Sequence, residues 1–271
     1  MTASRSVADV IAAARAQGRA ALVGYLPVGF PDVDTSVAAC RALVEGGADI
    51  VEVGVPYSDP LMDGPAIQHA VEVALERGAR PRDAFKAVAG VADAGGRAVV
   101  MTYWNPVDRY GVERFAADLA DAGGSGLITP DLIPDEADEW MAAADKHDLD
   151  RIFLVAPSST DERLVSTTRA CRGFVYAAST MGVTGTRGTV GSAAEGLVAR
   201  TRAVTDVPVC VGLGVSDRAQ AAQVAGFADG VIVGSALVKA LAAAATPGQG
   251  VDAVRALTAE LAAGVREGRG A

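Results

Sequence analysis

Eight short apolar segments separated by helical stretches constrain the fold of this chain more than any other feature. The segments, rich in Val, Ile and Leu, are residues 21–28, 49–55, 98–104, 125–129, 151–155, 173–179, 207–213 and 229–235. The stretches between them have helical spacing, and several end in glycine. Near-continuous apolar strands that alternate with helices indicate a parallel sheet covered by helices. Eight such strands in about 250 residues predict an α/β fold, a (β/α)8 TIM barrel, with a doubly wound open sheet as the alternative.

The chain has 271 residues and no linker or low-complexity segment. That length is sufficient for one domain with a large core, so we predict a single domain over residues 1–271. Residues 4–20 predict an extra N-terminal amphipathic helix. The gap from Pro56 to Arg97 leaves room for an additional helix.

Charge and cysteine usage exclude several classes of protein. The net charge is -9, and clustered Lys and Arg for binding a phosphate backbone are missing, so nucleic acid is not an expected partner. Cys40, Cys171 and Cys210 are widely spaced in apolar surroundings and predict reduced core residues. The chain shows neither a signal peptide nor an apolar run of membrane-spanning length. We therefore expect a soluble, cytoplasmic protein.

Two carboxylates near the second apolar segment are candidates for acid–base chemistry. Side chains alternate along DIVEVGV, so Glu52 shares a face with Ile50 and Gly54 and points into a core or lumen. Burial raises the pKa of a carboxyl by about 3 to 5 units, which suits a general acid or base near neutral pH. Asp63 follows on the turn-rich loop PYSDPLMDG. A structural Glu paired with an Arg, beside polar turn residues, is the alternative.

Other residue types narrow the chemistry further. The lysines, Lys86, Lys146 and Lys239, lie in helical stretches, so no strand offers the buried amine of a Schiff-base enzyme. His69 and His147 are far apart and have no companion ligands, so we expect no metal. A dinucleotide fingerprint after the first strand is also missing. Proton transfer is therefore expected to rest on the two carboxylates, without a cofactor.

Glycine and serine follow the last two predicted strands. Gly214 and Ser216 come after the seventh strand, and Gly234 and Ser235 after the eighth. Barrel enzymes often bind phosphate at these two places, on backbone N–H groups and a helix N-terminus. Tight-turn geometry explains either turn alone, but the two together favour a phosphorylated substrate. Residues 182–192, rich in Gly and Thr, predict a lid loop over that site.

Five motifs in order resemble the tryptophan synthase alpha chain family over essentially the whole chain. They are EVGVPYSDPLMDGPAIQ, MTYWNP, GVTG, GLGVS and VGSALV. The resemblance implies a carbon–carbon lyase of tryptophan biosynthesis that cleaves indole-3-glycerol phosphate to indole and glyceraldehyde 3-phosphate without a cofactor. It also implies that Glu52 protonates the indole ring at C3 and helps remove the side-chain hydroxyl proton. Asp63 would bind the indole N–H.

The same resemblance implies a substrate pocket. Its residues would be Tyr25, Met101, Ile128, Leu154, Tyr176, Thr184, Gly185, Gly214, Gly234 and Ser235. Tyr176 would lie beside Glu52, Tyr25 would line the pocket floor, and the three aliphatic side chains would form a slot for the indole. Core packing is the alternative for the aliphatic residues. Thr184 would contact Asp63 when the lid closes, and the three glycines and Ser235 would bind the phosphate.

A partner is implied as well, namely the tryptophan synthase beta chain, which carries pyridoxal phosphate, in an alpha2beta2 complex. The implied contact residues are Pro56, Asp59, Pro60, Asn105 and Asp131. Asp131-Leu132-Ile133-Pro134 departs from the DLP of many relatives, which alters a loop expected to face that partner. A stand-alone lyase that releases free indole, a non-catalytic regulatory subunit and another phosphate-binding barrel enzyme remain alternatives.

Overall fold

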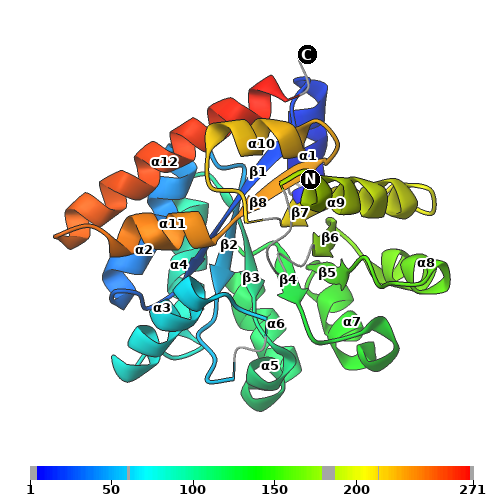
Figure 1. Ribbon diagram of the computed structural model, residues 1–271. Helices are drawn as coiled ribbons and strands as arrows, with labels where there is room; N and C mark the ends of the chain where they lie inside the picture. The colour runs from blue at the N-terminus through cyan, green and yellow to red at the C-terminus, as the bar shows by residue number, and fades with distance from the viewer. Residues whose placement is uncertain (1–4, 60–61, 179–186, 213, 269–271) are drawn as a thin grey trace.

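A closed barrel of eight parallel strands forms the centre of the molecule (Figure 1). The computed structural model describes residues 5–59, 62–178, 187–212 and 214–268. The strands are β1 (Ala21–Pro27), β2 (Ile50–Gly54), β3 (Arg97–Met101), β4 (Gly126–Thr129), β5 (Asp150–Val155), β6 (Val175–Ala178), β7 (Val209–Gly212) and β8 (Gly230–Val233). Each strand pairs with the next, and β8 pairs with β1. The predicted TIM barrel is therefore confirmed, and the open sheet is excluded.

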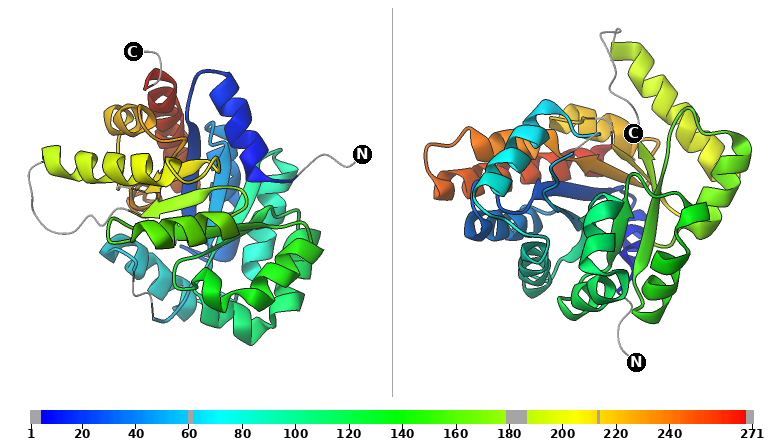
Figure 2. Two further views of the ribbon diagram at one scale, coloured as in Figure 1. Left: turned by 90° about the vertical axis from the view of Figure 1, so that its right-hand side faces the viewer. Right: turned by 90° about the horizontal axis from the view of Figure 1, so that it is seen from below.

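Helices surround the barrel in every view (Figures 1 and 2). They are α1 (Val7–Ala16), α2 (Val33–Glu45), α3 (Pro65–Glu76), α4 (Asp83–Asp93), α5 (Trp104–Tyr110), α6 (Val112–Asp121), the short 3-10 helix η1 (Pro134–Glu136), α7 (Asp138–Lys146), α8 (Asp161–Ala170), α9 (Arg187–Arg202), α10 (Arg218–Ala225), α11 (Ser235–Ala242) and α12 (Pro247–Glu267). The N-terminal helix is confirmed. Two helices, α3 and α4, occupy the gap between β2 and β3.

The alternation of side chains along β2 separates the barrel interior from the helical layer. Ile50 packs in a cluster with interior residues of the other strands, whereas Val51 and Val53 belong to the outer core beneath the helices. Tyr25 and Glu52 are partners in the β1–β2 register, and Glu52 is in turn the partner of Val99 on β3. The alternation predicted from DIVEVGV therefore places the Glu52 side chain inside the barrel.

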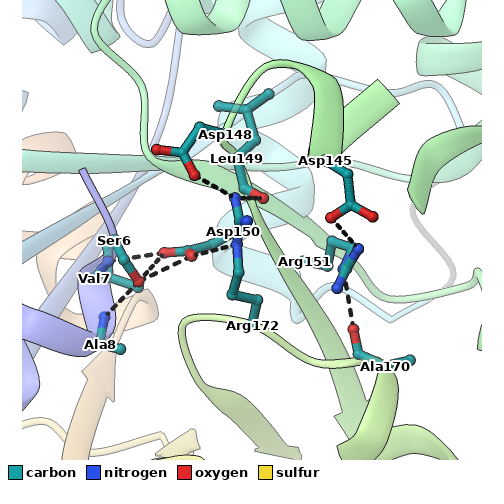
Figure 3. Close-up of polar contacts among 10 residues, drawn as sticks. All are labelled: Ser6, Val7, Ala8, Asp145, Asp148, Leu149, Asp150, Arg151, Ala170 and Arg172. Atoms are coloured by element: carbon teal, nitrogen blue, oxygen red, sulfur yellow. Dashed lines mark hydrogen bonds and ion pairs between the residues drawn. The ribbon is translucent and has the colours of Figure 1, made fainter. Parts of the chain in front are cut away.

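Helix α1 closes the end of the barrel where the strands begin. Val7, Ile11 and Ala14 are buried against the interior cluster. The helix is attached through Asp150, the first residue of β5, which accepts hydrogen bonds from the Val7 backbone N–H at 2.8 Å and the Ser6 hydroxyl at 2.9 Å (Figure 3). These carboxylate contacts satisfy the open N-terminus of α1 and fix it on the barrel.

Two predicted boundaries differ from the structure. The predicted strand 98–104 ends at Met101, and α5 begins at Trp104, whose backbone N–H donates to the Asp131 carboxylate at 2.9 Å. Pro106 then lies in the first turn, where it requires no N–H donor. The predicted lid loop 182–192 is also wrong from residue 187 onward, because α9 begins at Arg187. The Ala- and Arg-rich sequence that follows favours helix, and a helix extends more readily than it starts.

The state of the cysteines and the character of the helices can be compared with the expectations from the sequence. Cys40, Cys171 and Cys210 are buried and free, as predicted. Among the residues that the structure describes, no helix combines the length and the apolar character needed to cross a membrane.

Candidate active site

Glu52 is a buried carboxyl in the barrel interior. Its side chain lies at the centre of β2 and is 1% exposed. Its Oε2 atom has no hydrogen-bond partner among the described residues. Burial, reinforced by the negative charge of Asp63, raises the pKa of Glu52 to about 8. A carboxyl with these properties keeps its proton near neutral pH and can both donate it and take it back.

Asp63 follows β2 on the segment that leads into α3. It is half-buried, and burial raises the pKa of its carboxyl above the ordinary value. The Gln68 side-chain amide donates to the Asp63 carbonyl oxygen at 2.7 Å, which fixes the residue against the start of α3. The negative charge of Asp63 raises the pKa of Glu52, Tyr25 and Tyr176, so the loop carboxylate lies close to these interior side chains.

Tyr25 and Tyr176 lie in the interior beside the carboxylates. Burial, with the charges of Asp63 and Glu52, raises the pKa of Tyr25 well above its usual value. Burial and then the charge of Glu52 do the same for Tyr176, which is the register partner of Leu154 on β5. Both phenols therefore remain protonated and neutral at ordinary pH. They supply polar O–H groups in an otherwise apolar lumen.

The three aliphatic residues predicted for the slot come together at the ends of their strands. Met101 and Ile128 are partners in the β3–β4 register, and Ile128 is fully buried. Met101 and Leu154 are only partly buried and pack against the interior cluster that contains Ile128. This arrangement offers an apolar wall next to Glu52, which suits a flat hydrophobic ring.

The two glycine turns differ in what their helix N-termini already bind. At α10, the Asp217 side chain accepts from the Gln220 N–H at 2.9 Å and places a negative charge where an anion would have to sit. At α11, Gly234 precedes Ser235 and no side chain caps the helix. The first N–H groups of α11 are therefore the better anion site of the two. Gly214 has a φ of +64° and forms the turn after β7.

Thr184, Gly185 and Pro60 lie outside the residues that the structure describes. The described members of the predicted partner surface divide into two groups. Asp59, Asn105 and Asp131 are exposed, whereas Pro56 is buried in this chain. Pro56 therefore departs from the predicted contact surface, because it is not exposed in this chain. The Asn105 amide donates to the Tyr57 hydroxyl at 3.2 Å, so Asn105 is joined to that loop.

Sequence reasoning missed two kinds of residue at the site. Gly54 and Gly212 leave space for the tyrosine hydroxyls: a Cβ at Gly212 would lie 2.6 Å from the Tyr176 hydroxyl oxygen, and one at Gly54 would collide with that of Tyr25. The sequence shows Gly54 two residues after Glu52 in the strand, but it does not show that Tyr25 on the neighbouring strand lies against this glycine. Tyr103 was also missed. Its hydroxyl accepts from the Met62 backbone N–H at 2.9 Å, next to Asp63.

Within the described ranges, no three His, Cys, Asp or Glu side chains form a group that could hold a metal ion. His69 is exposed on α3, and His147 contacts Glu113 at 2.8 Å at the end of α7. The interior carboxyl, the loop carboxyl and the two phenols lie close together in the barrel.

Comparisons with known proteins agree with this geometry. Residues 11–266 match the family model described as tryptophan synthase alpha chain. The chain is 64% identical to the tryptophan synthase alpha chain of Nocardia farcinica, over 98% of each chain. It is 68% identical to that of Mycobacterium marinum, over 93% of this chain and 92% of the relative. A crystal structure of tryptophan synthase from M. tuberculosis contains a chain that superposes with a TM-score of 0.89 at 63% identity, covering 97% of this chain and 99% of that one.

Proposed function

This chain belongs to the tryptophan synthase alpha chain family, and we propose that Glu52 and Asp63 carry out the lyase reaction of that family. The reaction cleaves indole-3-glycerol phosphate to indole and glyceraldehyde 3-phosphate. The observation that carries the assignment is the Glu52 carboxyl, which is buried in the barrel interior with Oε2 unpartnered among the described residues. Burying a carboxyl without a partner for one of its oxygens costs free energy. Such a cost is expected at a functional site, because a structural carboxylate is normally paired.

Glu52 supplies and recovers the proton. Its raised pKa keeps the carboxyl protonated, so it can donate a proton to C3 of the indole ring. The resulting carboxylate accepts the proton of the adjacent side-chain hydroxyl. The C–C bond then breaks, its electron pair returns to the ring, and the hydroxyl carbon becomes the aldehyde. No proton or electron is gained or lost overall, which agrees with a reaction that needs no cofactor.

Asp63 and the lumen side chains position the ring. The Asp63 carboxylate accepts a hydrogen bond from the indole N–H and stabilises the positive charge that develops when C3 is protonated. Tyr25 and Tyr176 line the pocket beside Glu52, and Met101, Ile128 and Leu154 contact the ring faces. The phosphate binds at Gly234 and Ser235, with Gly214 on the neighbouring turn. The roles of Thr184 and Gly185 follow from the resemblance alone.

We also propose a tryptophan synthase beta chain as partner, in an alpha2beta2 complex in the cytoplasm, with pyridoxal phosphate bound in the beta chain only. The exposed Asp59, Asn105 and Asp131 support this surface. Of these, Asn105 lines a hollow of about 320 Å³ together with Tyr57 and Pro106. Comparing indole turnover with and without a beta chain separates this proposal from a stand-alone lyase. The proposed unit is one domain over residues 1–271.

The carboxylate roles are tested with Glu52→Gln and Asp63→Asn. Each variant keeps the shape of the side chain and removes its acid–base chemistry or charge. We expect indole release to fall by about 100-fold or more in each, while binding of a non-cleavable substrate analogue persists. Steady-state indole release and analogue titration are measured in parallel. Turnover like that of the unmodified chain in either variant would contradict the assignment of that residue.

A further inference from the structure

Asp63 requires a defined position, yet the described residues beside it offer few contacts. Met62, the preceding residue, has a side chain that is 57% exposed and packs on little. Gly64, the following residue, is the N-cap of α3 and has no side chain to cap it. The Gln68 contact to the Asp63 carbonyl is local, because Asp63 lies two residues before α3 and Gln68 lies near the start of that helix. A contact from another part of the barrel can therefore fix the direction of the Asp63 carboxylate.

Tyr103 provides that contact from a different part of the barrel. Its hydroxyl oxygen accepts from the Met62 backbone N–H at 2.9 Å, across 41 residues of sequence. Its ring also lies against the ring of Tyr57, near the start of the same segment, with centroids 5.3 Å apart. Tyr103 thus contacts the Asp63 segment at two points, one in each half.

Tyr103 is itself buried, and the backbone on both sides of it is hydrogen-bonded. It is only 6% exposed, and it lies between two residues whose backbone N–H groups are bound to β4 and to the loop that follows β4. The Thr102 N–H donates to the Ile128 carbonyl at 3.2 Å, and the Trp104 N–H donates to the Asp131 carboxylate at 2.9 Å. A phenol held on both sides in this way can fix a neighbouring loop, because it does not move with that loop.

We propose that Tyr103 is a positioning residue that fixes the Asp63 segment through the Met62 N–H and so sets the direction of the Asp63 carboxylate. The inference rests on the proposed function of Asp63 and deepens it. Burial, with the charge of Asp63 among the lesser causes, raises the pKa of Tyr103 to about 12, so the hydroxyl stays neutral and keeps accepting from Met62 across the working pH range. Without this contact, the loop spends less time in the conformation that aligns Asp63 with the substrate.

The test is Tyr103→Phe in the full chain, which removes the hydroxyl and keeps the ring packed on Tyr57. Losing the net contribution of one hydrogen bond, here the one from the Met62 N–H, corresponds to a decrease in kcat of about fivefold to tenfold. We expect this decrease with binding of a non-cleavable substrate analogue nearly unchanged. Hydrogen exchange at the Met62 amide should become faster. Tyr110→Phe is the matched control, because it removes a hydroxyl at the far end of α5, the helix that Tyr103 precedes, and that hydroxyl contacts Asp118 instead. It should leave kcat unchanged.

A double-mutant cycle with Asp63→Asn shows whether Tyr103 acts through Asp63. If it does, Tyr103→Phe has no further effect on kcat once Asp63 is replaced. An equal fold-decrease in both backgrounds, or an unchanged kcat and Met62 exchange rate in Tyr103→Phe alone, would overturn the positioning role while Asp63→Asn still loses turnover. Full turnover in Asp63→Asn alone would instead refute the proposed function of Asp63, and the inference with it.

Discussion

Glu52 and Asp150 are equally buried carboxyls with opposite surroundings. Each is 1% exposed. Glu52 lies in the middle of β2 with Oε2 unpartnered among the described residues, whereas Asp150 begins β5 and accepts from Val7 and Ser6 and pairs with Arg172 at 3.3 Å (Figure 3). Burial raises the pKa of both. For Glu52 the charge of Asp63 adds to the increase, whereas for Asp150 the contacts from Val7, Ser6 and Arg172 oppose it.

The difference shows how one barrel separates stability from chemistry. At the end closed by α1, a buried charge is enclosed by donors and by Gly126 and Gly173, where any Cβ would collide with Asp150. In the interior, a buried carboxyl is left able to exchange a proton with a substrate. Glu52 avoids the cost of a buried charge by keeping its proton, whereas at Asp150 the contacts from Val7, Ser6 and Arg172 offset part of that cost. Replacing Asp150 should therefore affect mainly the stability of the fold, and replacing Glu52 mainly the turnover.

The largest expected effect on stability comes from Asp150→Asn. The substitution keeps the side-chain volume, removes the charge paired with Arg172, and leaves the Ser6 and Val7 donors with one good acceptor instead of two. We expect the free energy of unfolding to fall by about 3 kcal/mol, with kcat unchanged, because the residue lies away from Glu52 and Asp63. Urea unfolding and steady-state indole release measure the two quantities.

Asp145→Asn is the matched control for that variant. Asp145 pairs with Arg151 at 2.5 Å near the same strand, but its side chain is 60% exposed. An exposed pair of this kind contributes about 0 to 1 kcal/mol. A loss of stability no larger for Asp150→Asn than for Asp145→Asn would show that burial and the contacts to α1 add nothing to the Asp150 site.

These two carboxyls also show what the sequence could and could not predict. Glu52 was predictable because a single acidic residue interrupts an apolar strand, and strand alternation alone gives the direction of its side chain. Asp150 was not, because its partner Ser6 lies 144 residues earlier and nothing near either residue indicates the contact. The same limitation applies to Tyr103 and Met62, which meet only because the β2 and β3 loops lie side by side at one end of the barrel.

Element order was predictable for a related reason. The eight strands follow from local apolar runs, and neighbouring strands pair in sequence order, so the barrel required no long-range information. Boundaries depended on contacts that local sequence does not contain. Trp104 continues an apolar run, and only the Asp131 carboxylate, from the next loop, shows why a helix starts there. The start of α9 was missed because glycine and threonine dominate its first turns.

The second-largest expected effect on stability is its dependence on pH through Glu52. Between its ordinary pKa of 4.5 and its raised pKa of about 8, the folded chain keeps a proton on Glu52 that the unfolded chain has released. Stability therefore falls as pH rises through this window. Glu52→Gln has no such proton, so its free energy of unfolding should rise relative to the unmodified chain by about 1.4 kcal/mol per pH unit, or roughly 2 kcal/mol between about pH 6 and 7.5.

Urea unfolding of both proteins at several pH values across that range measures the difference. Other carboxyls titrate in both proteins and largely cancel in the comparison, with Asp63 as the group whose charge acts directly on Glu52. A difference in stability that stays constant with pH would mean that Glu52 is ionised throughout. That result would remove the proposed proton donor as well.

The smallest effect is expected from Ser6→Ala, which weakens the Asp150 site from the side of the helix. Ser6 is the N-cap of α1: its hydroxyl accepts from the Ala8 N–H at 3.2 Å and donates to Asp150. Loss of a cap costs about 1 kcal/mol. Thr160→Ala is the matched control, because Thr160 caps α8 through the Arg163 N–H and contacts no buried carboxylate. We expect Ser6→Ala to lower the free energy of unfolding more than Thr160→Ala and to speed hydrogen exchange throughout α1, with indole release unchanged in both. Equal losses in the two variants would reduce Ser6 to an ordinary cap, and slower indole release in Ser6→Ala would mean that the two ends of the barrel are coupled.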